Sequence, residues 1–202
     1  MSDSATAIAT PGGAARAKNG QMSTALATQR LLLRLPVAGD ASAAAELLTD
    51  PEVMRFLGGE VVPEERVGAV VEKWIWRWEE NGIGFFVVES CEDGAFLGRI
   101  GLNVWDVRSW THATLAAAGE YAQPELGWAL VRSQWGRGYA TEAALAVRDW
   151  AFKQRDIRRL ISLIAPDNLA SAAVARRLGA SPTQQVKLFD CGDAVVWEHP
   201  RS

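Results

Sequence analysis

Two glycines separated by one residue, Gly136 and Gly138, lie between a strand-like run and a helix-like run, within the segment 134–141. Glycine allows the backbone to curl so that several N–H groups point into one space. The first amides of a helix are also unpaired and carry partial positive charge. A phosphate is the anion that best fits such a turn, where Arg137 would add charge at the rim and Thr141 a hydroxyl. A tight strand-to-helix turn without a ligand explains the same glycines, so the turn alone leaves both interpretations open.

Two nucleotide-binding motifs do not match this turn. The sequence contains no G-x-x-x-x-G-K-[ST] loop, and Thr141 stands where the dinucleotide fingerprint G-x-G-x-x-G requires its third glycine. The dinucleotide fold also places this turn after its first strand, whereas here the turn comes late in the chain. A nucleotide-dependent enzyme or binder is therefore kept only as a weaker alternative.

Composition excludes several classes of partner. The net charge is −3, from 21 basic and 24 acidic residues, which gives no basic footprint for nucleic acid or an acidic membrane. No apolar run approaches the roughly 20 residues of a membrane span. The two cysteines, Cys91 and Cys191, do not form a disulfide framework, and with only two histidines no metal site is expected. We expect a cytoplasmic protein that binds neither nucleic acid nor membrane.

The hydrophobic patterns predict one α/β domain over residues 25–202. Its predicted strands cover residues 30–35, 84–90, 96–105, 124–131, 160–165, 184–190 and 194–199, the last two joined by a turn at 191–193. Its predicted helices cover residues 39–48, 50–57, 63–80, 139–155 and 167–180, with Asp40 near the first N-cap and Gly179 closing the last helix. The strand-turn-helix-strand block from 124 to 165 implies a parallel strand pair with a right-handed crossover. Residues 106–122 are expected to form a long loop or extended hairpin.

The first 24 residues differ from the rest of the chain. Residues 1–24 are rich in Ala, Ser, Thr and Gly and show no periodicity, so we expect a disordered tail. They lack the apolar centre of a signal peptide. Met22 offers a second candidate for the start of translation.

Several segments, taken together, resemble the GNAT acyltransferase superfamily, and most strongly its branch of ribosomal-protein N-terminal acetyltransferases. The glycine turn is similar to the family's glycine-rich turn, and Asn168 with Ser171, followed by Arg-Leu-Gly-Ala at 177–180, is similar to its next block. The opening segments 28–36 and 50–59 also resemble this branch. The resemblance runs from about residue 28 to the end of the chain.

The resemblance implies a mixed, mostly antiparallel sheet of about six or seven strands, flanked by helices, with a splayed parallel pair. Acetyl-CoA would lie between the diverging strands, its diphosphate on the amides of the turn and its pantetheine arm along the fourth strand. Asn168 would hydrogen-bond the arm. The coenzyme-binding residues implied in this way are Trp128, Ala129, Leu130, Gln134, Trp135, Gly136, Arg137, Gly138, Tyr139, Ala140, Thr141 and Asn168.

Amine acetylation requires removal of a proton from the ammonium and benefits from protonation of the departing thiolate. The resemblance implies Glu125 as the base, in a Glu-Leu-Gly-Trp pattern, with Glu120 as the fallback. Ala175 stands where many family members carry an acidic tyrosine, and Ser171 matches a serine proposed for that task in this branch. A solvated or ion-paired Glu125, and a Ser171 hydroxyl bonded to a carbonyl one turn earlier, are the structural alternatives.

The acceptor is expected to be a primary amine, on a small molecule or at a peptide N-terminus. Its contacts should come from residues 54–85 and 105–122. Three tryptophans in these segments either form an aromatic wall over the acceptor or cover the core or a dimer surface: Trp76, Trp105 and Trp110. His112 is either an aid to proton transfer or a surface residue. The acidic composition mildly favours a cationic acceptor. Homodimers are common in the family, so a homodimer is a further expectation. A non-catalytic CoA-binding or acyl-sensing module is the alternative to an enzyme.

Overall fold

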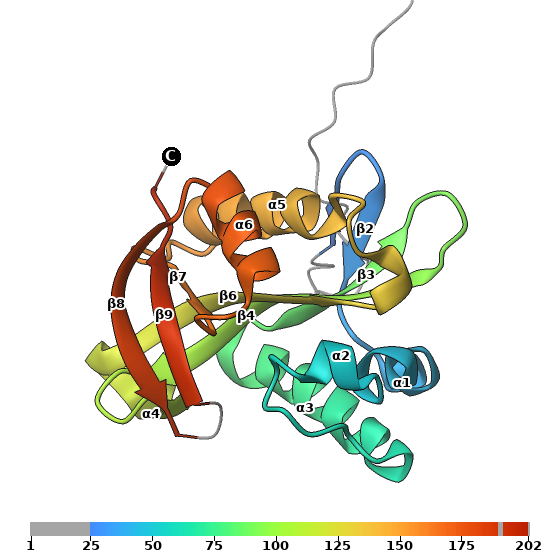
Figure 1. The fold of residues 1–202 in the computed structure, drawn as a ribbon, viewed down its shortest axis with the longest axis horizontal. Helices are drawn as coiled ribbons and strands as arrows, with labels where there is room; N and C mark the ends of the chain where they lie inside the picture. The colour runs from blue at the N-terminus through green and yellow to red at the C-terminus, as the bar shows by residue number, and fades with distance from the viewer. Residues whose placement is uncertain (1–24, 190–191, 202) are drawn as a thin grey trace, which may run out of the picture.

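The computed structural model describes residues 25–189 and 192–201. The predicted tail at 1–24 lies outside the described residues, as do residue 190, the last of a predicted strand, and residue 191, the first of the predicted turn at 191–193. Nine strands form one sheet in the order β1-β2-β3-β4-β6-β7-β9-β8, with β5 paired to β4 (Figure 1). The strands are β1 (Leu26–Ala27), β2 (Leu31–Arg34), β3 (Phe85–Ser90), β4 (Phe96–Asp106), β5 (Thr111–His112), β6 (Ala122–Leu130), β7 (Ile161–Ile164), β8 (Ser181–Leu188) and β9 (Gly192–Glu198). The α-helices are α1 (Ala41–Leu48), α2 (Pro51–Met54), α3 (Val67–Asn81), α4 (Leu115–Ala118), α5 (Tyr139–Gln154) and α6 (Leu169–Arg177).

The mixed, mostly antiparallel sheet is confirmed, and its parallel pair is β6 with β7. The strand count is higher than expected because β1 and β5 contain two residues each and are too short to produce an alternating pattern. Residues 106–122 were expected to form a long loop or an extended hairpin. The structure shows the β4–β5 hairpin, followed by the short helix α4, which was not predicted. The helix predicted over 50–57 ends at Met54 and continues as turns.

Asp40 immediately precedes α1 as expected, but its side chain does not cap that helix. Its carboxylate instead accepts the amide of Val37 at 2.7 Å and pairs with Arg34 at 2.6 Å. Arg34 also binds Glu89 of β3 at 2.6 Å, so Asp40 ties the start of α1 to the sheet edge.

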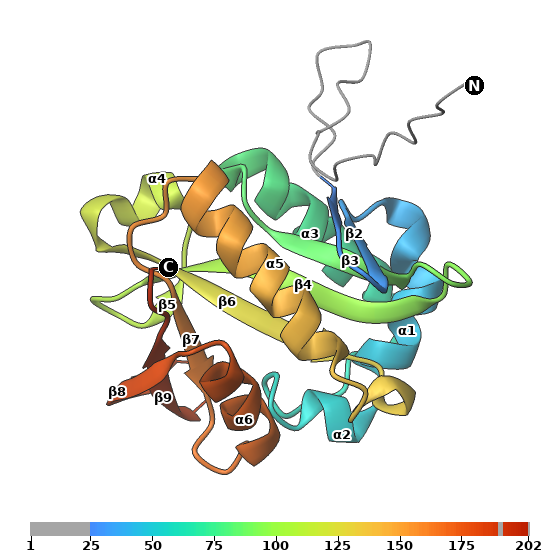
Figure 2. The same cartoon turned by 90° about the horizontal axis from the view of Figure 1, so that it is seen from above.

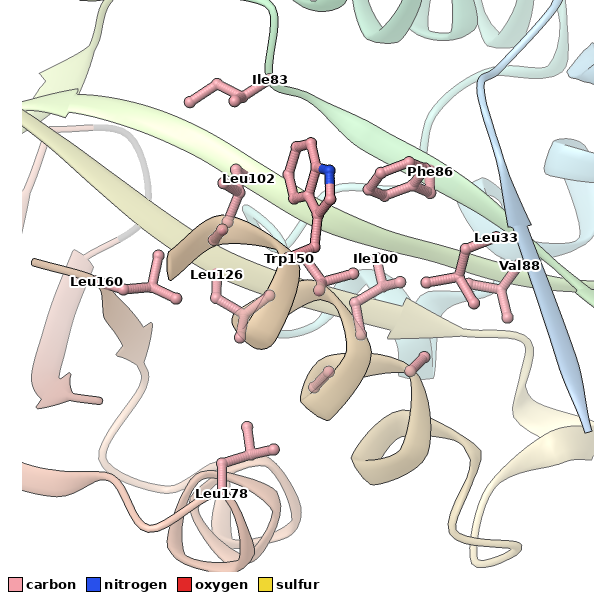
Figure 3. Close-up of a cluster of buried hydrophobic side chains, with 14 of the residues drawn as sticks. Leu33, Ile83, Phe86, Val88, Ile100, Leu102, Leu126, Trp150, Leu160 and Leu178 are labelled. Carbon is pink, nitrogen blue, oxygen red and sulfur yellow. The ribbon is translucent and has the colours of Figure 1, made fainter. Parts of the chain in front are cut away.

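Helices cover both faces of the sheet, with α5 and α6 on one side and α1, α2 and α3 on the other (Figure 1). On the α5 side, Ile100, Leu102 and Leu126 are almost fully buried against Trp150 (Figure 3). The Trp150 ring meets Phe86 edge-on at 5.3 Å between centroids. Each such buried side chain contributes about 1.5–3 kcal/mol, so α5 is firmly anchored and holds the glycine turn at its N-terminus in a fixed place.

The parallel pair is brief. Within the described residues, β6 and β7 are in register only at Glu125 and Ile161, whereas β6 continues to Leu130 along β4. The two strands then diverge, and α5 crosses the sheet above them (Figure 2). The edge of β6 that faces β7 beyond Glu125 therefore lacks a strand partner. No helix in the described part of the chain is long and apolar enough to cross a membrane.

Candidate active site

The glycine turn leads directly into α5. Gly136 and Gly138 have φ angles of +75° and +81°, in the left-handed region that favours glycine, and Gly138 is the N-cap of the helix. Gly138 has no side chain with which to satisfy the first helical amides, those of residues 139–141. The indole N–H of Trp135 donates to the carbonyl of Leu130 at 2.8 Å, which ties the turn to the end of β6. The turn thus presents unpaired amides at the positive end of a 16-residue helix.

Side chains from the start of the described chain hold this turn in place through Glu142, and local sequence patterns did not indicate these contacts. We call this set of contacts the clamp. Glu142 in the first turns of α5 accepts hydrogen bonds from the Thr28 hydroxyl at 2.6 Å and from Arg30 Nε at 2.7 Å. Arg30 also donates to the carbonyl of Arg137 at 3.1 Å and places its guanidinium 4.5 Å from the centre of the Tyr139 ring. Burial opposes ionisation of Glu142, but the bonds from Thr28 and Arg30 outweigh it and hold the pKa of this carboxyl below its ordinary value.

A cavity of about 900 Å³, the coenzyme cavity, runs from this turn across the end of β6 to the start of α6. It brings together these residues predicted from the sequence: Trp128, Ala129, Leu130, Gln134, Trp135, Gly136, Gly138, Tyr139, Ala140, Thr141, Asn168 and Ser171. Arg137 is the one predicted coenzyme residue outside this lining, and it is exposed.

Asn168 and Ser171 occupy the first turn of α6. Asn168 is the N-cap, and its Oδ1 accepts the Ser171 amide at 3.0 Å, so the oxygen has a structural task. Ala175, which stands in place of an acidic tyrosine, is fully buried. Asn168 and Ser171 line both the coenzyme cavity and a second one, which makes them part of the junction between the two.

The second cavity, the acceptor cavity, has a volume of about 360 Å³ and contains Glu125. Glu125 is only 9% exposed, and its Oε2 accepts the indole N–H of Trp105 at 2.9 Å. Its Oε1 lies over Gly127, 3.4 Å from where a Cβ of that residue would stand. Burial raises the pKa of the Glu125 carboxyl, and the Trp105 hydrogen bond and the positive charges of Arg99 and Arg77 offset this only in part.

Of the other acceptor-side residues predicted from the sequence, some line the acceptor cavity and others lie outside it. Trp105 lines the acceptor cavity, and its ring lies 4.0 Å from that of His112, which also lines it. Trp110 lies outside both linings, as does Trp76, which is 46% exposed. The fallback base Glu120 is exposed and likewise outside both. Of these three tryptophans, only Trp105 is therefore placed to contact an acceptor in the cavity.

The acceptor cavity draws Trp74 and Arg77 from the segment 54–85, where acceptor contacts were expected, although neither residue was singled out from the sequence. Arg99 lies outside the two segments expected to bind the acceptor. Arg99 could have been found from the sequence, because it is a charged residue in the interior of β4, whose other residues are mostly apolar. Arg77 gave no comparable signal on its helix. Among the described residues, no group of three or more His, Cys, Asp or Glu side chains is arranged to hold a metal ion.

Comparison with known proteins agrees with this geometry. The family model described as an acetyltransferase (GNAT) domain matches residues 30–181. The protein YkkB of Bacillus subtilis is 30% identical over 85% of this chain and 94% of its own length. A crystal structure of an acetyltransferase from Agrobacterium tumefaciens is 30% identical, with a TM-score of 0.73 over 93% of this chain and all of its own. The RimL ribosomal-protein acetyltransferase, solved with coenzyme A, shares the fold at 18% identity, with a TM-score of 0.66 over 87% of this chain and 97% of its own.

The chain therefore belongs to the GNAT acetyltransferase family. This family consists of N-acetyltransferases, so the protein is classed as an acyltransferase.

Proposed function

We propose that the protein transfers the acetyl group of acetyl-CoA to a primary amine by direct attack in a ternary complex. The observation that carries this proposal is the meeting of two cavities. Phe56, Leu57, Trp128, Asn168 and Ser171 line both, so a ligand in one cavity reaches a ligand in the other. Glu125 lines the acceptor cavity next to this junction.

The coenzyme cavity matches the parts of coenzyme A. The amides of residues 136–141 receive the diphosphate, supported by the dipole of α5. The edge of β6 at residues 128–130 is not paired with β7, so its backbone groups pair with the pantetheine amides as those of an added strand would. Because Oδ1 of Asn168 is bonded to α6, the contact of Asn168 with the arm comes from Nδ2. When bound, acetyl-CoA supplies an activated thioester, and coenzyme A bound to RimL is consistent with this assignment.

Glu125 acts as the general base. Its ionised carboxylate takes a proton from the acceptor ammonium, directly or through a water molecule, and the freed nitrogen attacks the thioester carbonyl. The C–N bond forms, the C–S bond breaks, and the sulfur leaves with the electron pair of that bond. A backbone N–H of β6 polarises the carbonyl. As the tetrahedral intermediate collapses, the nitrogen loses its second proton to solvent, while Ser171 at the junction donates its hydroxyl proton to the departing sulfur and regains a proton from solvent. A thiolate is a good leaving group, so the buried Ala175 in place of tyrosine does not prevent the reaction.

Release of free thiol from acetyl-CoA across a panel of primary amines tests this proposal. We expect amine-dependent release, and a loss of about 10²- to 10⁴-fold in kcat/KM for Glu125→Gln with coenzyme binding retained. Glu120→Gln is the matched control, because Glu120 is exposed outside both cavities, and it should change little. Coenzyme binding without turnover on any amine would instead favour a CoA-binding or acyl-sensing module. The acceptor, the cytoplasmic location and the homodimer stay predictions.

A further inference from the structure

The acceptor cavity carries more positive than negative charge, in contrast to the acidic chain as a whole. Its basic side chains are Lys73, Arg77 and Arg99, and Glu125 is the one acidic side chain among the described residues that line it. An acceptor with only an ammonium group would add a further positive charge to this space. The local charge therefore favours an acceptor that brings an anion with it.

Arg99 is placed as a ligand-binding group rather than as a partner in an ion pair. Its guanidinium carbon lies 3.9 Å from the centre of the Phe85 ring and 5.6 Å from that of Trp74. Its Nε is buried and has no hydrogen-bond partner in the described part of the chain. Across the same residues, neither Arg99 nor Arg77 has a carboxylate within 4.0 Å. A partly buried guanidinium without a carboxylate partner is costly, and a bidentate carboxylate is its natural complement.

Arg77 lies beside the same ring. Its guanidinium carbon is 5.5 Å from the centre of Phe85, so two guanidinium groups lie close to one aromatic side chain. Burial, reinforced by the charge of Arg77 and offset in part by the charge of Glu125, lowers the pKa of Arg99 to about 10, so Arg99 is still protonated at neutral pH. A bound anion would relieve the repulsion between the two.

Phe85 also connects this cationic pair to the proposed base. A Cβ on Gly127 would stand 3.6 Å from the Phe85 ring and 3.4 Å from Oε1 of Glu125. The pairing of Arg99 with Ala129 and of Asn103 with Glu125 places Gly127 between the two sites on one face of the sheet. A small molecule lying over Gly127 can thus present its amine to Glu125 and its anionic end to Arg99.

Resting on the acetyltransferase function proposed above, we infer that the acceptor is a small primary amine that also bears a carboxylate, which Arg99 and Arg77 bind while Glu125 receives the amine. The amino acids are the simplest members of this class. Arg99 and Arg77 set specificity, whereas Glu125 takes part in the chemistry.

The test compares acceptors that differ only at the carboxylate. Initial rates are measured for the common L-amino acids and for their primary carboxamides, with acetyl-CoA as donor. The carboxamides have the less basic amines, so more of their amine is already deprotonated at neutral pH. We expect wild-type kcat/KM to favour the best amino acid over its carboxamide by about 10- to 150-fold, the range for a hydrogen-bonded charged group. Arg99→Gln should reduce this preference to about twofold or less while the KM for acetyl-CoA stays the same.

Arg66→Gln is the matched control, because Arg66 is exposed and lines neither cavity, and it should retain the preference. A purely structural Arg99 would lower activity on both acceptors equally and leave their ratio unchanged. If Arg99→Gln does not fold, Arg77→Gln should still reduce the ratio, and the wild-type comparison needs no variant.

The outcomes separate the two proposals. Equal wild-type rates on acid and carboxamide, or acetylation only of amines without a carboxylate, would overturn the inference and leave the acetyltransferase function standing. Bound coenzyme with no turnover on any amine would refute the proposed function itself, and the inference with it.

Discussion

Trp105→Phe removes the hydrogen bond that the Trp105 side chain donates to the Glu125 carboxylate and leaves the backbone hydrogen bond from Leu163 in place. The indole N–H donates to Oε2 at 2.9 Å inside the acceptor cavity, where burial already raises the pKa of Glu125. A donor to a carboxylate stabilises its ionised form and so lowers its pKa. Phenylalanine keeps an aromatic ring in place but has no donor, so the pKa of Glu125 should rise further.

The size of the change follows from the hydrogen bond. A hydrogen bond to a charged group is worth about 1.5–3 kcal/mol, and one pKa unit corresponds to about 1.36 kcal/mol. Loss of the bond should therefore raise the pKa of Glu125 by the equivalent of this free energy. Since the base must be ionised to act, kcat/KM at a pH below both pKa values should fall by about 10- to 100-fold. At a pH above both values it should be nearly unchanged.

The assay is the pH profile of kcat/KM with one acceptor, read as the position of the acid limb. The ionisation of the acceptor is common to both enzymes, so any difference between them reports a group of the protein. Trp76→Phe is the matched control, since Trp76 is exposed and lines neither cavity, and it should leave the limb in place. An acid limb that does not move in Trp105→Phe, or an equal loss at every pH, would refute the role of Glu125 as the base.

Three further predictions concern the turn and the fold. Gly138→Asp places a negative charge at the proposed diphosphate site and should weaken coenzyme A binding, measured by calorimetry, by at least about tenfold. Gly94→Asp is the control, because Gly94 is also a left-handed glycine (φ +71°) but lines neither cavity, and it should not weaken binding. Equal losses of affinity in the two variants would argue against the site. Arg30→Met removes the guanidinium from the clamp on Glu142 and leaves the Thr28 hydrogen bond in place. It should lower the melting temperature by about 2–4 °C for each kcal/mol lost and weaken coenzyme binding. If neither quantity changes, the Arg30 side chain does not support the turn. Burial lowers the pKa of His199 to about 4 from 6.5, so the stability that depends on its neutral form is complete above pH 6.5 and is lost as the pH falls toward 4. His199→Gln should flatten this acid-side loss, about 3 kcal/mol at most, in urea unfolding at a series of pH values, and identical slopes in both proteins would contradict it.

The hydrogen bonds explain why protonation of His199 is costly. The Ser162 hydroxyl donates to the carbonyl of Leu126 at 2.6 Å, so its oxygen accepts from Nε2 of His199 at 2.9 Å. The neutral ring therefore carries its proton on Nε2. Nδ1 is buried without a partner among the described residues, and a proton added there would place an unpaired charge in the core.

The sequence predicted those features that depend on local pattern. The apolar stripe of α3 and the apolar runs of β3 and β4 extend over many residues, so these elements were predicted to within a few residues of their ends. The two-residue strands β1 and β5 were missed because their pairing partners, not their own residues, define them. The glycine turn was recognisable because positive φ angles are rare for other residues.

The missed site features depend on contacts between distant parts of the chain. Arg30 and Glu142 are 112 positions apart, and neither residue indicates its partner locally. The burial of Glu125 follows from the packing of Trp105 and the brief β6–β7 pairing, so a strand-end carboxylate was an equally valid interpretation before the fold was known. The cationic character of the acceptor cavity likewise arises where α3 crosses β4, and the net charge of the chain pointed the other way.

A crystal structure of the protein with coenzyme A would show directly whether the glycine turn binds the diphosphate. We expect the diphosphate oxygens to lie within hydrogen-bonding distance of the backbone nitrogens of residues 136–141, and the thiol to reach the junction lined by Asn168 and Ser171. Coenzyme A bound elsewhere, or a glycine turn that contacts no part of it, would contradict the account.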